Sequence, residues 1–210
     1  MSTVLITVFA GLICDPVAFR APPQKPSTKE PTYYYPVKVG AKWVFEKELW
    51  NKDEVLVVTL VTKGDAGFLV TVEQENSKGE RSPNHKMLVS AEGLWLTEEQ
   101  GEPYSPPWQV LKVPHKAGDK WDVTTERAAA IAASVKHSVI LCRVAAEPEL
   151  LKVPSGKFDA LKVSTTKTKV NGKAVDDSVS WYAAGIGLLK QEWKNGRTIG
   201  TLKVFTPGKD

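Results

Sequence analysis

The sequence predicts an all-β protein built on a strongly curved antiparallel sheet, either a half-open barrel or a sandwich, with at most one short helix. Short runs of alternating apolar and polar residues recur along the chain at near-regular spacing. Hairpin-forming pairs such as Asn171-Gly172 and Asn195-Gly196 separate some of these runs. No long segment repeats its apolar residues with the 3.6-residue period of an amphipathic helix.

The densest pattern lies near the C-terminus, where we expect a meander of antiparallel strands. Pro154-Ser155-Gly156 has the composition of a turn. The expected strands after it are residues 158–168, 174–183, 188–193 and 198–205. Gly185 and Gly187 predict a kink or bulge between the second and third of these strands. The rest of the chain is expected to add strands to this meander.

Earlier parts of the chain carry the same alternation. The expected strands there are residues 43–50, 55–62, 68–75, 86–90, 94–97, 121–125 and 135–145, with a short extended piece at 110–113. Residues 98–107 are polar and contain prolines, which predicts a loop, with Trp108 beside it. Residues 128–133 alone have helical propensity. In total we expect about eight to eleven strands, from the usual strand lengths.

Length and the N-terminal residues predict one domain behind a leader. A chain of 210 residues is long enough for one sizeable core. We expect a signal-like leader at 1–21, a Pro-rich linker at 22–32 and a single antiparallel β domain at 33–210. The apolar run at 4–12 is too short to span a bilayer. The prediction is therefore export to the periplasm or cell envelope, and the alternative is a cytosolic protein in which this segment is disordered or forms a buried N-terminal strand.

The two cysteines carry separate expectations. Cys14 follows Gly11-Leu12-Ile13, which loosely resembles a lipoprotein box, so a lipid anchor on Cys14 is one expectation. Ile13 departs from that box, because a small residue usually precedes the modified cysteine. Cys142 lies in an apolar run and is expected to be an inert buried thiol. Two cysteines placed in this way predict no disulfide framework.

Charge and composition limit the partners. The 28 basic and 24 acidic residues give a formal net charge of +4 and are interspersed along the chain. No basic run with interleaved aromatic residues is present, so we expect no nucleic-acid partner. The expected partners are an apolar small molecule, a lipid or an envelope protein. Contact with a membrane is expected only through the leader or a lipid anchor, and the sequence sets no oligomeric state.

One motif occurs twice. Residues 36–43 and 114–121 share the pattern Pro-x-Lys-x-Gly-x-Lys-Trp. Each copy is expected to be a turn that leads into a strand anchored by its tryptophan. We favour a shared local solution over a duplication, because Val44-Phe45 and Asp122-Val123 differ directly after the motif.

Three further motifs are similar to motifs found in other proteins. They are Tyr-x-Pro-x-x-x-Gly-x-x-Trp at 34–43, Val-Pro-x-Gly-x-Phe-x-Ala-x-Lys-Val at 153–163, and Trp-Tyr-Ala-x-Gly-Ile-Gly-Leu at 181–188. In these motifs the chain resembles a group of uncharacterised exported bacterial β-sheet proteins, many of them predicted lipoproteins. The resemblance implies a strongly curved antiparallel sheet similar to that of lipoprotein carriers, and it implies no reaction. Ser155 departs from the alanine more common in the group.

No catalytic, cofactor or metal site is predicted. The three histidines, His85, His115 and His137, stand far apart, whereas a metal needs converging ligands. Asp176 and Asp177 are expected at consecutive strand positions, which would point them to opposite faces. No Gly-x-Ser-x-Gly elbow is present, although a triad is a spatial arrangement that sequence alone does not exclude. Because histidine is scarce and the acidic residues lie mostly in turns or alternate with lysines, we expect no enzyme and no cofactor.

Aromatic residues are the feature that could hold a ligand. The candidates are Trp43, Trp95, Trp108, Trp121 and Trp181. One hypothesis is a non-enzymatic envelope protein that binds a hydrophobic or peptide-like ligand within the curved sheet. A second is a structural or interaction module with a filled core, and a third is a hydrolase with an unrecognised site. An apolar pocket would favour the first hypothesis over the second, and a buried polar triad would favour the third.

Overall fold

The computed structural model describes residues 31–48, 51–114, 118–127, 136–144, 148–170, 173–175, 177–193 and 195–209. Pro31–Asp210 forms one compact unit. The leader, most of the linker, Cys14, His115 and Asp176 lie outside the described residues, as does the stretch 128–133 with helical propensity. No helix among the described residues is both long enough and apolar enough to cross a membrane.

The compact unit consists of antiparallel strands, which confirms the predicted fold class. The strands are β1 Lys42–Lys47, β2 Lys52–Gly64, β3 Gly67–Glu75, β4 Arg81–Ser90, β5 Gly93–Glu99, β6 Glu102–Lys112, β7 Lys120–Arg127, β8 Lys136–Val144, β9 Glu149–Val153, β10 Gly156–Val170, β11 Lys173–Val175, β12 Ser178–Ala183, β13 Gly187–Trp193 and β14 Thr198–Thr206.

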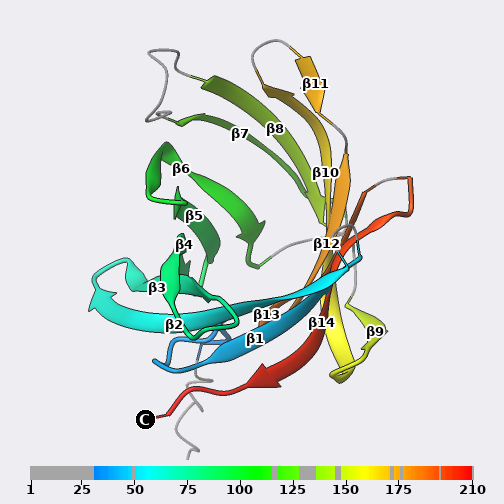
Figure 1. The fold of residues 1–210 in the computed structure, drawn as a ribbon. Coiled ribbons are helices and arrows are strands. Elements are labelled where there is room, and N and C mark those ends of the chain that lie inside the picture. The colour runs from blue at the N-terminus through cyan, green and yellow to red at the C-terminus, as the bar shows by residue number, and fades with distance from the viewer. Residues whose placement is uncertain are drawn as a thin grey trace, which may run out of the picture. The chain divides into compact units, whose positions relative to one another are not determined.

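All of these strands belong to one sheet, which curls strongly (Figure 1). Its order is β11-β10-β12-β13-β14-β1-β2-β3-β4-β5-β6-β7-β8. β8 also pairs with β10, and β9 pairs with the start of β10. Between β6 and β7 the sheet stays open, because only Tyr104–Arg127 and Ser105–Glu126 pair there. The predicted meander is its C-terminal part, β10 and β12 to β14.

The concave face of the sheet carries the core. Residues that pair directly across neighbouring strands share a face. One such row runs from Val58 through Val72, and the next holds Val70 and Met87. The largest side chains at no more than 1% exposure are Val58, Val70, Val72, Val89, Leu94, Leu111, Leu161, Leu189 and Leu202. This part of the concave face is therefore filled by its own side chains.

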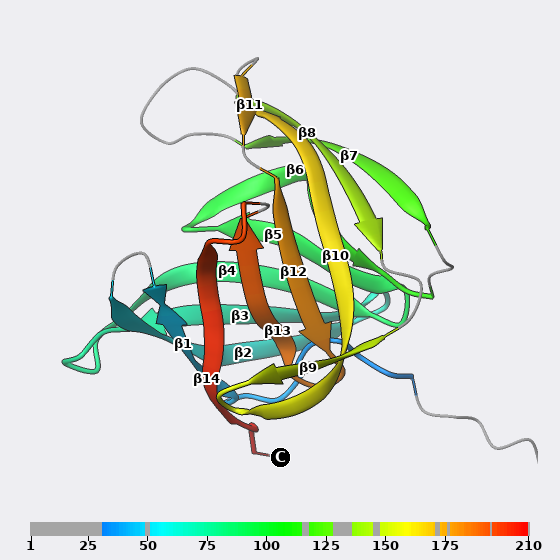
Figure 2. The ribbon, with the colours of Figure 1, turned by 90° about the vertical axis from the view of Figure 1, so that its right-hand side faces the viewer.

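The hairpin of β9 and β10 crosses the outside of the sheet at one end. Figure 2 shows β9 in front of the ends of β12, β13 and β14. Ser155 N donates to Leu202 O at 3.4 Å, which ties the turn of the hairpin to β14. Val153 is 6% exposed. The turn predicted at Pro154-Ser155-Gly156 is confirmed.

The predicted loop at residues 98–107 is wrong. β5 continues to Glu99 and β6 begins at Glu102, with those two residues paired. Gln100 and Gly101 form the turn, with φ of 52° and 81°. Prolines are tolerated at bulges, and Pro106 and Pro107 lie where the register of β6 against β5 shifts between Trp108 and Pro103. Trp108 is therefore a strand residue.

Two smaller expectations also change. Gly185 and Gly187 adopt φ of 71° and 89° in a turn that reverses the chain, since Ala183 pairs with Gly187. They make a hairpin turn, where a kink or bulge was expected. Asp177 lies before β12, outside a strand. The described residues form fourteen strands, more than the expected eight to eleven, because β6, β9 and β11 were not counted as full strands.

Candidate functional site

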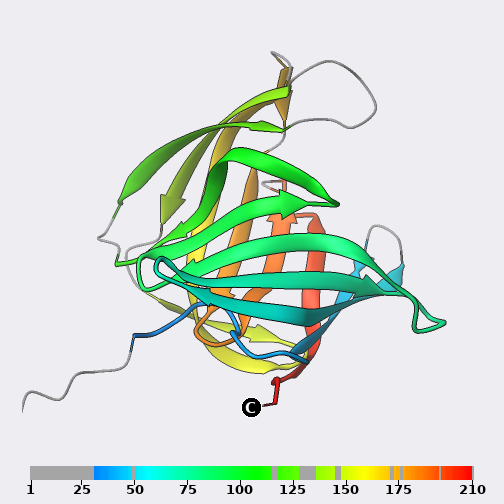
Figure 3. The same cartoon turned by 90° about the vertical axis from the view of Figure 1, so that its left-hand side faces the viewer.

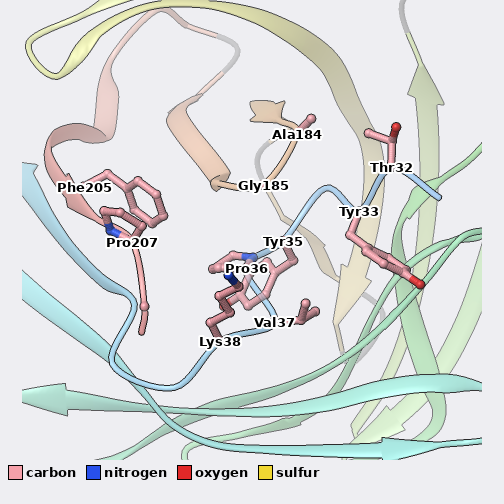
Figure 4. A pocket seen from close by; sticks show the side chains of 11 residues that line it. Thr32, Tyr33, Tyr35, Pro36, Val37, Lys38, Ala184, Gly185, Phe205 and Pro207 are labelled. Carbon is pink, nitrogen blue, oxygen red and sulfur yellow. The ribbon is translucent and has the colours of Figure 1, made fainter. Parts of the chain in front are cut away.

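A pocket of about 410 Å³ lies at one end of the curled sheet, and we call it the base pocket. Figure 4 shows that three chain segments far apart in sequence surround it. Its lining residues are Thr32, Tyr33, Tyr35, Pro36, Val37, Lys38, Ala184, Gly185, Phe205, Pro207 and Gly208. Its volume is within the range of about 300–1,000 Å³ usual for ligand sites.

Main-chain hydrogen bonds hold the three segments together. Gly185 N donates to Tyr33 O at 2.7 Å, which joins the β12–β13 turn to the N-terminal segment. Lys209 N donates to Val39 O at 3.1 Å, which joins the C-terminal segment to the same strip of chain. A Cβ on Gly208 would stand 2.6 Å from Lys38 O, so only glycine permits this close approach.

Tyr35 fixes the inner wall of the pocket through a buried hydrogen-bond chain. Its hydroxyl lies 2.6 Å from His85 Nε2, and His85 Nδ1 lies 2.6 Å from Asn84 Oδ1. Nδ1 must donate to the amide oxygen, so Nε2 accepts from the tyrosine hydroxyl. Burial lowers the pKa of His85 to about 4. Burial, with a smaller effect of Tyr182, raises the pKa of Tyr35. Both groups are neutral at pH 7.

Trp43 lies behind this wall. Its ring centre is 5.4 Å from that of Tyr35 and 6.1 Å from that of Phe205, and both of these residues line the pocket. The indole Nε1 donates to Ile186 O at 2.7 Å, in the turn that also carries Gly185. Trp43 is 2% exposed. It therefore supports the pocket and can report on it without lining it.

The chemistry of the lining is mainly apolar. Aromatic rings, prolines, Val37 and Ala184 supply most of the surface, and Lys38 is its charged member. The hydroxyl of Tyr35 is already committed to His85. The lining brings together no nucleophile with a general base, the pairing that covalent catalysis uses. An arrangement of this kind suits the burial of a hydrocarbon group.

The predicted tryptophans lie elsewhere. Trp43, Trp121 and Trp181 are 2%, 8% and 6% exposed, while Trp95 and Trp108 are half-buried. Trp121 Nε1 donates to Gln109 O at 3.1 Å. None of the five lines the base pocket. Sequence reasoning placed the start of the domain at Tyr33-Tyr34-Tyr35-Pro36, but it did not assign these aromatic residues to a site.

Other predicted residues are only partly placed. His85 is held by Tyr35 and Asn84, while His137 and Cys142 belong to β8, whose side chains are not described. In the part of the chain that the structure describes, no group of three or more His, Cys, Asp or Glu side chains could hold a metal ion.

Comparison with known proteins gives distant similarity only. No family model and no curated protein matches the chain. A candidate lipoprotein of Parabacteroides distasonis aligns with 16% identity and a TM-score of 0.45, over 85% of this chain and all of that one. A candidate exported protein with a YmcC-like fold, from Bacteroides fragilis, aligns with 11% identity and a TM-score of 0.43, over 83% of this chain and 99% of that one. Similarity of this size carries no information about the site.

Proposed function

We propose that the protein is a non-enzymatic binding protein of the cell envelope that holds an acyl chain or a similar hydrocarbon group in the base pocket. The observation that carries the proposal is the 410 Å³ pocket lined by Tyr33, Tyr35 and Phe205. Burial of apolar surface stabilises such a complex by roughly 25 cal/mol per Å². The signal-like run at residues 4–12 supports the cellular location.

The proposed ligand position is the base pocket, whereas the sequence-based hypothesis placed the ligand within the curved sheet. Side chains such as Val58, Leu111 and Leu202 already fill the concave face at 0% exposure. A guest there would have to displace them, at a cost of several kcal/mol by the scale of core substitutions. The base pocket needs no such displacement. A filled concave face is also what the hypothesis of a structural or interaction module expects.

Tryptophan emission tests the proposal directly. A fatty acid brominated in mid-chain should quench emission saturably, because bound bromine would lie near Trp43 behind the pocket wall. Trp43→Phe should remove most of the quenching. Absence of any saturable quenching would overturn the proposed site.

A matched pair of variants locates the binding. Val37 lines the pocket, whereas Val39 is 48% exposed in the same segment and does not. Val37→Glu should lower the affinity for the brominated fatty acid, measured by quenching, about tenfold or more. A carboxylate in an apolar pocket costs at least about 1.4 kcal/mol of binding free energy. Val39→Glu should change it little. Equal loss in both variants, with unchanged melting temperatures, would place the ligand elsewhere. Turnover of an ester, peptide or glycoside panel by pure protein would contradict the non-enzymatic assignment.

A further inference from the structure

A row of apolar side chains crosses the outer face of the sheet. Leu69 pairs with Leu88, and Leu88 pairs with Trp95, so the three share the face opposite the core. Leu69 is 38% exposed, and Leu60, on the neighbouring strand, is 56% exposed. Figure 3 views the sheet from this side, with β2 to β6 in front. Exposed apolar rows of this kind are typical of interaction surfaces.

The row ends in a groove of about 530 Å³, which we call the outer groove. Leu88, Trp95 and Tyr33 line it, together with residues of the turns before β3 and β5. Asp65 stands on the first turn and Glu92 on the second, and both are exposed. Neither carboxylate has an ion pair or a side-chain hydrogen bond among the described residues. The lining holds no lysine or arginine.

Another tryptophan on the same sheet shows what covers such a surface. Trp181 pairs with Lys162 on one side and with Lys190 on the other. The two ammonium groups lie 5.3 and 5.7 Å from its ring centre, and the indole Nε1 donates to Glu149. Trp181 is 6% exposed and also belongs to the cluster of buried core residues. The two cross-strand lysines thus cover the indole ring with their aliphatic stems and place their ammonium groups close to it.

Trp95 lacks that cover within the described chain. Its cross-strand neighbours are Leu88 and Gln109, and it remains half-buried. Asp65 and Glu92 line the same groove as Trp95, whereas Glu149 accepts a hydrogen bond from the Trp181 indole. Trp95 therefore has the aromatic face and the acidic neighbours of the Trp181 site, without the cations.

We propose that the outer groove binds a peptide segment of a partner protein that presents lysine or arginine beside aliphatic residues. The cation would lie over Trp95 between Asp65 and Glu92, where aromatic face and carboxylates attract the same charge. The aliphatic side chains would cover Leu88 and Leu69. An anionic lipid or acidic peptide is disfavoured, because the two carboxylates repel it. Tyr33 lines both this groove and the base pocket, which share no other lining residue, and the two sites take different classes of ligand.

The test uses two labelled eight-residue peptides of alternating sequence, one of leucine and lysine and one of leucine and glutamate. Fluorescence anisotropy with the full chain should show saturable binding of the lysine peptide alone. The double variant Asp65→Asn/Glu92→Gln should weaken it about fivefold, the effect of losing two exposed pairs of roughly 0.5 kcal/mol each. Both residues are exposed, so the fold should be unaffected.

The control is Glu46→Gln/Asp159→Asn, which removes the same charge from two exposed acidic residues outside the groove. It should leave the affinity unchanged. Equal weakening in both double variants would mean that the lysine peptide responds only to the total charge of the protein, and this would overturn the proposal. Binding of the glutamate peptide with equal affinity, or no binding of the lysine peptide, would overturn it as well. Acyl-chain binding at the base pocket is unaffected by any of these outcomes.

Discussion

The described residues of the two copies of Pro-x-Lys-x-Gly-x-Lys-Trp share a left-handed glycine and a buried tryptophan, although the peptide before Pro114 is cis and the one before Pro36 is not. Gly40 and Gly118 adopt φ of 82° and 73°, the left-handed conformation that glycine reaches without strain. Trp43 and Trp121 are both buried at a strand start. Each indole donates to a carbonyl of a distant segment, Ile186 O in the first copy and Gln109 O in the second.

The strands that follow the two copies differ in their partners. β1 pairs with β14 on one side and with β2 on the other over nearly its whole length. β7 pairs with β8 throughout, but with β6 at only two residue pairs. The motif therefore sets where a strand begins and how its tryptophan is anchored. Whether the sheet continues beside that strand depends on the neighbouring strand, here the proline-bearing β6.

The largest expected effect is the loss of either tryptophan. Trp43→Ala should lower the free energy of unfolding by about 3–5 kcal/mol, the range for large aromatic side chains in a core. Trp121→Ala should cost about 2–3 kcal/mol, because its sparsely paired surroundings can relax into the space. Urea unfolding of both variants measures the difference. Equal losses of unfolding free energy would mean that the sparse pairing between β6 and β7 does not let the structure relax around position 121.

The next effect is a dependence of stability on pH. It is expected near the first copy, because Tyr35, directly before that copy, is hydrogen-bonded to His85. The folded-state pKa of His85, about 4, lies below the ordinary value near 6.5, so the unfolded chain binds the proton first. Stability should therefore fall as pH drops from about 6.5 to 4, by on the order of 1–3 kcal/mol. His85→Gln keeps an acceptor for Tyr35 and should flatten this slope. An unchanged slope would assign it to other groups.

The two glycines should respond alike. Gly40→Ala and Gly118→Ala each place a Cβ in open space, so the cost is the left-handed backbone alone, about 1–2 kcal/mol. Gly→Asn at the same positions should cost less, because asparagine tolerates this conformation. Chemical denaturation of the four variants checks both statements. Clearly unequal costs for the two alanine variants would show that the copies are not locally equivalent.

The smallest effect isolates the indole hydrogen bond. Trp43→Phe and Trp121→Phe keep an aromatic ring but leave Ile186 O and Gln109 O without their indole donor. Each should cost roughly 1 kcal/mol beyond the change in packing. The 2.7 Å bond of Trp43 should cost more than the 3.1 Å bond of Trp121. The reverse order in unfolding experiments would contradict this ranking.

Local sequence patterns predicted most strands and several turns, because alternation and turn chemistry act over a few residues. The strand expected at 68–75 matches β3, and the strand expected at 198–205 matches β14. The prolines of 98–107 misled the prediction, since Pro106 and Pro107 lie at an interruption of the β5 ladder that no local pattern shows. The base pocket escaped prediction for the same reason. Tyr33, Gly185 and Phe205 meet only through long-range hydrogen bonds and packing.

The chain enters the sheet through a short strip that is also one wall of the base pocket. Tension applied to the chain ahead of Pro31 would reach the Tyr33 and Tyr35 hydrogen bonds before it reaches β1. β1 lies between two ladders that would share the force, whereas the strip has few bonds to resist it. Single-molecule pulling at this end should show a small first release before the sheet yields. A stretched N-terminus would then open the pocket while the sheet stays intact, so mechanical strain could empty the site.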